Sequence, residues 1–108
     1  IDRAWGETAM VPTQVQVVTV PSRLGLDTIT VVLQDLGDGR GRLMVECYGQ
    51  AWACYWNAMG TGLRAFLRRC DVTYLETNLR RGTGQRRPNA HLRRVVEAVL
   101  GALKEAAV

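Results

Sequence analysis

The hydrophobic pattern changes its period near the middle of the chain, and this change restricts the possible folds more than any other feature. Apolar and polar residues alternate in the segments 14–20, 27–34 and 42–48, and the first two of these are rich in Val, Ile and Thr. Such alternation is typical of strands that bury one face. Further along, apolar residues recur at intervals of three and four, as in amphipathic helices. Strands followed by helices predict an α+β fold.

Short turns join the three expected strands. The residues PSRLGL at 21–26 and the pair Asp38-Gly39 have the composition of turns. Because consecutive strands joined by short turns pair antiparallel, the sequence predicts a three-stranded antiparallel meander. The apolar residues of one face in the second and third strands are Ile29, Val31, Leu33, Leu43, Val45 and Cys47.

The segment CYGQAWACYWNAMG, residues 47–60, contains two of the three tryptophans, two of the three tyrosines and two of the three cysteines. After Gly49, the residues Trp52, Tyr55, Trp56 and Met59 are spaced as one stripe of a helix. We expect this helix to end at Gly60 and to cover the sheet with its aromatic rings. The alternative is a partly exposed aromatic patch that stacks on bases or anchors a protein partner.

Further helices are expected at about 62–70, from a cap at Asp71 to Gly82, and at about 89–106. The stretch 80–89, RRGTGQRRPN, has no apolar residue and is predicted to be a loop. Three to four helices would then pack on one face of the sheet. The apolar stripe of the last helix is Leu92, Val95, Val96, Val99, Leu100 and Leu103.

A chain of 108 residues, 47% of them hydrophobic, fits a single domain. We interpret residues 1–13 as a flexible tail or expression remnant, and residues 14–108 as one α+β domain. No apolar run approaches the roughly 20 residues of a membrane-spanning helix. The sequence also lacks a leader pattern, so a cytoplasmic location is expected. An odd number of cysteines, three, favours reduced and buried thiols.

No residue pattern indicates catalysis. The cysteines have no CxxC spacing, and His91 is the only histidine that could complete a metal site or activate a thiol. The carboxylates fall in turns, in caps and on solvated helix faces rather than as a pair set for acid–base work. We therefore expect no metal, no cofactor and no enzymatic activity. The GTG at 82–84 precedes a helix and is a weak candidate for anion binding.

Positive charge is concentrated in the second half of the chain. Residues 1–63 carry four arginines and six acidic groups, whereas residues 64–108 carry nine arginines, one lysine and four acidic groups. Guanidinium groups on a loop and on the first turns of a helix would attract phosphate. The alternatives are docking on an acidic protein surface, or a solvated loop that only confers solubility. The candidate binding residues are Arg80, Arg81, Arg86, Arg87, Arg93 and Arg94, with Arg64 and Arg68 extending the patch if their helix lies beside the loop.

The run VECYGQAWACYWNAMGTGLRAFLRRCDVTYL, residues 45–75, resembles the central segment of small proteins encoded in early regions of tailed phages and in prophages. The resemblance covers 31 of the 108 residues and implies a phage origin but no mechanism. The matching positions are Cys47, Tyr48, Ala51, Trp52, Tyr55, Trp56, Met59, Gly60, Phe66, Leu67, Cys70, Tyr74 and Leu75.

A phage origin implies that such a protein acts by binding, in the cytoplasm of the bacterial host. The leading hypothesis is association with nucleic acid through the arginine-rich loop. The alternative is an anti-defence protein, such as an anti-CRISPR, that inhibits a host complex by protein–protein interaction. Exposed sheet edges also make a homodimer possible.

Overall fold

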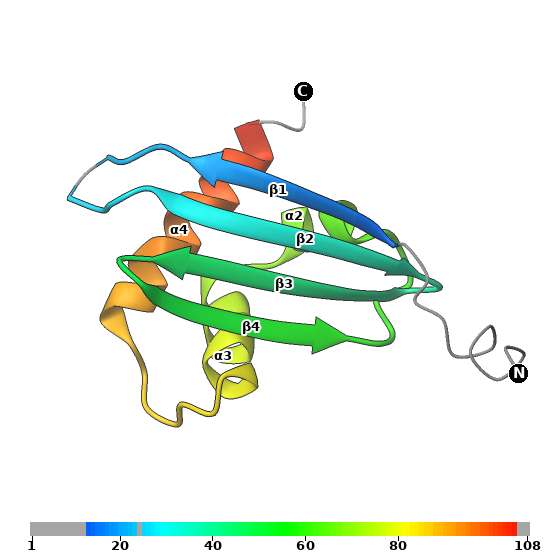
Figure 1. The fold of residues 1–108 in the computed structure, drawn as a ribbon. Helices are drawn as coiled ribbons and strands as arrows, with labels where there is room; N and C mark the ends of the chain where they lie inside the picture. The colour runs from blue at the N-terminus through cyan, green and yellow to red at the C-terminus, as the bar shows by residue number, and fades with distance from the viewer. Residues whose placement is uncertain (1–12, 24, 106–108) are drawn as a thin grey trace, which may run out of the picture.

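The computed structural model describes residues 13–23 and 25–105. Within this part of the chain, four strands form one antiparallel sheet and three helices follow (Figure 1). The α+β class, the meander and the helical layer against the sheet are as predicted. In chain order, the elements are β1 (Gln14–Val20), β2 (Ile29–Gly37), β3 (Arg40–Cys47), β4 (Gln50–Trp56), α2 (Leu63–Arg69), α3 (Val72–Gly82) and α4 (Ala90–Glu105).

The predicted aromatic helix after Gly49 is wrong, because these residues form strand β4. Trp52, Cys54 and Trp56 point into the core, whereas Tyr55 lies on the opposite face with 45% of its surface exposed. Two residues four apart share a face in a helix and also in a strand. The spacing of the two tryptophans therefore fits both structures. The expected burial of the tryptophans is confirmed, and that of Tyr55 is wrong.

The core lies between one face of the sheet and the three helices (Figure 1). Helix α3 packs against β4, α2 against β2 and β3, and α4 against β1 and β2. The alternating residues predicted for β2 and β3 and the whole apolar stripe predicted for α4 are buried. Burial of this surface contributes most of the favourable free energy of folding.

None of the three described helices lies on the other face of the sheet (Figure 1). Across it, strand pairing aligns Val17, Val32, Met44 and Ala53, one residue from each strand. Val17 and Met44 are exposed. Among the described residues, β1 pairs only with β2, so its outer edge is open.

Two turns of the same kind connect β2 to β3 and β3 to β4. Asp38 and Gly39 have φ of 56° and 74°, and Tyr48 and Gly49 have φ of 57° and 77°. Two consecutive residues with positive φ are the mark of the type I′ turn that suits antiparallel hairpins. The first turn was predicted from its Asp-Gly pair, but the second was not.

Helix boundaries follow the predicted caps closely. The Asp71 carboxylate accepts a hydrogen bond from the Tyr74 backbone N–H at the start of α3. The Asn89 side chain accepts one from the Leu92 backbone N–H at the start of α4. The expected loop at 80–89 is shorter, since residues 80–82 form the end of α3.

No helix in the described part of the chain is both long and apolar enough to cross a membrane. The expected tail at 1–13 falls almost wholly on residues 1–12, which lie outside the described residues.

Candidate functional site

The segment 83–89 joins α3 to α4 and lies beside the edge of β4 (Figure 1). Gly82 allows this approach, because a Cβ atom there would collide with the backbone carbonyl of Ala53. The Thr83 hydroxyl accepts a hydrogen bond from the Ala53 N–H at 3.0 Å and donates one to the Leu79 carbonyl at 2.9 Å. The end of α3 therefore covers part of the β4 edge and fixes where segment 83–89 begins.

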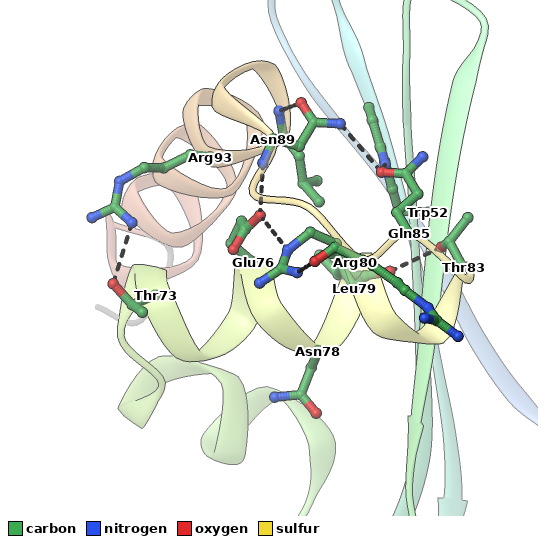
Figure 2. Close-up of polar contacts among 12 residues, drawn as sticks. Trp52, Thr73, Glu76, Asn78, Leu79, Arg80, Thr83, Gln85, Asn89 and Arg93 are labelled. Carbon is green, nitrogen blue, oxygen red and sulfur yellow. Dashed lines mark hydrogen bonds and ion pairs between the residues drawn. The ribbon is translucent and has the colours of Figure 1, made fainter.

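Glu76 and Arg80 fix the segment 83–89 through hydrogen bonds from its buried side. Glu76 is 6% exposed and is the one charged or polar residue that is buried in residues 13–23 and 25–105. Its Oε2 accepts hydrogen bonds from Arg80 Nε at 3.0 Å and from the Asn89 backbone N–H at 3.2 Å (Figure 2). Arg80 Nη1 donates to the Arg86 carbonyl at 2.6 Å. A buried carboxylate needs such partners, so this pair ties both ends of the segment together.

Gln85 ties the middle of the segment to the sheet and to α4. Its Oε1 accepts hydrogen bonds from Trp52 Nε1 at 3.4 Å and from Asn89 Nδ2 at 3.3 Å (Figure 2). Its backbone N–H donates to the Arg80 carbonyl at 2.8 Å. The segment is thus a built loop with many internal partners rather than a loose connection.

Three of the predicted arginines remain available on this loop and on the end of α3 that leads into it. Arg81, Arg86 and Arg87 are exposed, and their side chains make no hydrogen bond or ion pair with the described residues. They lie at the end of α3 and just before α4, on backbone that the contacts above hold in place. We call Arg81, Arg86 and Arg87 the arginine cluster.

The other five predicted arginines lie elsewhere or are engaged within the fold. Arg80 forms the ion pair with Glu76. Arg93 Nη1 donates to Thr73 Oγ1 at 3.2 Å, between α4 and α3 (Figure 2). Arg94 lines a pocket with Arg23 and Glu97 at the other side of α4.

Arg64 and Arg68 do not extend the cluster. Arg64 Nη1 donates to Gln16 Oε1 on β1 at 2.6 Å, and both arginines line a groove of about 820 Å³ between β1 and α2. Because β1 and β4 are the two edges of the sheet, this groove and the arginine cluster lie on opposite sides of the molecule. The Nε atoms of both arginines are buried without a hydrogen-bond partner among the described residues.

Tyr48 is a candidate that the sequence analysis missed as a binding residue. Its ring is 65% exposed and lies against the His91 ring, with centroids 6.3 Å apart. His91 lies in the first turn of α4 and also contacts the Trp52 ring, with centroids 5.8 Å apart. Figure 1 shows the β3–β4 turn beside the start of α4. The signal that could have found Tyr48 is the glycine that follows it, which marks a turn.

The cysteines are buried and their thiols are poorly ionised. Burial raises the pKa of the Cys54 thiol to about 12 and that of the Cys70 thiol to about 11. Burial also raises the pKa of Cys47. Because the thiolate is the nucleophile and the metal ligand, such thiols react slowly. In the described residues, no three His, Cys, Asp or Glu side chains gather in a group that could hold a metal ion.

A family model described as a phage family matches residues 10–106 of the chain. This match spans nearly the whole chain and extends well beyond the central segment that carried the resemblance to phage proteins. No curated protein and no solved structure matches the chain.

Proposed function

Because the chain belongs to a family of phage proteins, we propose that it acts by binding, and that its ligand is nucleic acid held by the arginine cluster. Arg81, Arg86 and Arg87 contact the phosphates, while Arg80 maintains the loop from which they project. The proposed place of action is the cytoplasm of the bacterial host. The observation that carries this proposal is the presence of three exposed arginines whose side chains have no partner among the described residues, one at the end of α3 and two on the ordered segment that follows it.

Phosphate is a suitable ligand for such a cluster on physical grounds. A guanidinium group presents a rigid set of donors that matches phosphate oxygens in a bidentate geometry. The cluster also lies near the N-terminus of α4, where the helix dipole favours anions. Since internal hydrogen bonds already order the loop, binding costs less conformational entropy than it would on a mobile segment.

Arg93 takes a secondary part in this proposal. Its one recorded partner is the neutral hydroxyl of Thr73, so its charge is not compensated by that contact. It can attract a strand that passes over the contact between α3 and α4. Arg64, Arg68 and Arg94 are left out because they lie away from the cluster.

The test is binding of a fluorescent oligonucleotide, followed by anisotropy at 50 and 200 mM salt. For three phosphate contacts to a single strand, counterion release predicts a loss of affinity of about 20-fold over this range. The double variant Arg86→Ala/Arg87→Ala is expected to bind weakly and to reduce the slope of log affinity against log salt by about 1.4. Arg69→Ala is the control, since it removes an exposed arginine from α2.

Affinity that does not change with salt, or no binding at either salt concentration, would contradict nucleic-acid binding. An anti-defence protein that inhibits a host complex would instead retain a host protein from lysate after nuclease treatment. If Arg86→Ala/Arg87→Ala abolished that retention, the arginine cluster would be a protein-docking surface.

The possible homodimer also stays a proposal, and its best location is the open edge of β1. This strand, QVQVVTV, has no charged residue and no proline, which are the usual devices that protect an edge. A two-fold axis at Val17 would pair Val15 of each copy with Thr19 of the other, and Val17 with itself. Sedimentation at increasing concentration should show the dimer, and Val17→Lys should return it to monomer. A wild-type chain that stays monomeric would disprove this.

A further inference from the structure

The conformation of Tyr48 is not the one that its residue type prefers. Its φ of 57° is in the left-handed region, where a residue with a Cβ atom is crowded and a bulky one is rare. Asn, Asp or Gly is the usual choice for this position of a type I′ turn. The fold therefore has a tyrosine at a position where several smaller residues would be more stable.

Packing does not explain this choice. Tyr48 is 65% exposed, and among the described residues its ring contacts only that of His91. Gly49, the next residue, has nothing within 4 Å of where a Cβ atom would lie, so this side of the turn is open. A strained and exposed side chain that contributes little to the core is best explained by contact with a ligand.

The position of the ring connects it to the arginine cluster. His91, which the ring contacts, lies in the first turn of α4, a few residues after Arg86 and Arg87. Gln85 accepts a hydrogen bond from Trp52, whose ring also contacts the His91 ring. An aromatic surface of Tyr48 and His91 and a set of free guanidinium groups thus flank the same end of α4.

We propose that Tyr48 is a stacking platform for an unpaired base, and that the ligand of the arginine cluster is therefore single-stranded nucleic acid. This inference rests on the proposed function. Proteins that hold single strands combine cationic grooves that follow the backbone with aromatic rings on which bases stack. In a duplex, the faces of the bases are covered by their neighbours, so an exposed ring has nothing to stack on except at the ends.

The experiment compares a single strand with a blunt duplex of the same length and salt concentration, using wild type, Tyr48→Asn and Tyr48→Phe. The wild type is expected to bind the single strand more tightly. Tyr48→Asn should weaken binding of the single strand at least fivefold, the lower end of what one stacked base contributes. It should change duplex binding less than twofold. Tyr48→Phe keeps the ring and should bind as the wild type does.

The slope of log affinity against log salt concentration is a second test of the stacking proposal. Tyr48→Asn removes no phosphate contact, so its slope should equal that of the wild type, unlike that of Arg86→Ala/Arg87→Ala. If the arginine variant weakens both ligands and Tyr48→Asn weakens neither, only the stacking proposal fails. A duplex bound more tightly than the single strand would also overturn it. If no oligonucleotide binds, both proposals fail.

Discussion

The turns at Asp38-Gly39 and Tyr48-Gly49 have nearly the same backbone and opposite surroundings. Both place two consecutive residues at positive φ, within 3° of each other at corresponding positions. The first turn is packed, since the Gly39 carbonyl accepts a hydrogen bond from the Met59 N–H at 2.8 Å. The second is open around Gly49, and its tyrosine is exposed apart from the contact with His91.

The difference shows which turn residues have the backbone conformation that their residue type prefers. Aspartate tolerates the left-handed region and is common in such turns, so Asp38 agrees with its local structure. Tyrosine is disfavoured in the left-handed region. The second turn forms nevertheless, because β3 and β4 pair on both sides of it. Natural sequences are locally consistent except where a function requires otherwise.

The largest effect is expected from a methyl group on each turn glycine. Gly39→Ala would place its Cβ 3.1 Å from the Gly60 backbone nitrogen and keep a positive φ, so we expect a loss of about 2–3 kcal/mol in the free energy of unfolding. Gly49→Ala meets nothing within 4 Å, and only the strain of about 1 kcal/mol remains. Urea denaturation measures both. Equal losses would show that the first turn is not packed as described.

Placing a tyrosine in the first turn gives the next largest effect. Asp38→Tyr should lower the free energy of unfolding by about 1 kcal/mol, because it introduces the strain that the second turn already carries. Oligonucleotide binding should stay at the wild-type level, since the first turn lies away from the arginine cluster. A variant as stable as the wild type would mean that tyrosine is not strained in this kind of turn.

The reverse change should stabilise the protein. Tyr48→Asn gives the Asn-Gly pair that type I′ turns favour, and we expect a gain of about 0.5–1 kcal/mol in the free energy of unfolding. Thermal unfolding of wild type, Tyr48→Asn and Tyr48→Phe checks this, with Tyr48→Phe unchanged. A loss of stability in Tyr48→Asn would show that the ring contributes to the fold, and would remove the argument from strain.

The smallest effect is a dependence on pH at Asp35, which links the first turn to the start of α2. Asp35 accepts hydrogen bonds from the Gly37 N–H at 2.9 Å and from the Leu63 N–H at 3.1 Å, and these bonds lower its pKa from 3.8. A lowered pKa means that the carboxylate stabilises the fold above about pH 4, and that this contribution is lost as the pH falls further. Amide exchange at Gly37 and Leu63 should therefore be faster at low pH, after correction for intrinsic rates.

Asp35→Asn is the control for that measurement. It removes the ionisable group, so exchange at these two amides should no longer change with pH beyond the intrinsic rates. If wild type and Asp35→Asn showed the same dependence, another group would have to be responsible.

The two turns also show why part of the fold could be predicted and part could not. The Asp-Gly pair is a known hairpin signal, and it predicts the first turn. A tyrosine in the same position gives no such signal, so the second turn was not predicted and β4 was interpreted as a helix. Cys54 and Tyr55 are the residues that separate the two interpretations, because the strand buries Cys54 and exposes Tyr55. In α3 and α4, apolar stripes and caps agreed with each other, and the predicted helices were confirmed.

The candidate site was predicted only by its charge. Runs of arginine are visible in a sequence, and Arg81, Arg86 and Arg87 are exposed at the end of α3 and on the segment that follows it. That Arg80 bonds to Glu76 instead depends on the burial of Glu76 between two helices, which is a property of tertiary packing. The position of Arg64 near the opposite edge of the sheet likewise follows from strand order, which sequence patterns did not provide.

The hydrogen bonds of Glu76 and Gln85 also restrict the length of the segment between α3 and α4. The Asn89 N–H reaches Glu76 while the Gln85 side chain reaches Trp52, so both bonds depend on the number of residues between α3 and α4. One residue more or less would move Arg86 and Arg87 relative to the helices. Insertions and deletions among members of this phage family are therefore expected outside residues 83–89, even where the arginines themselves are replaced.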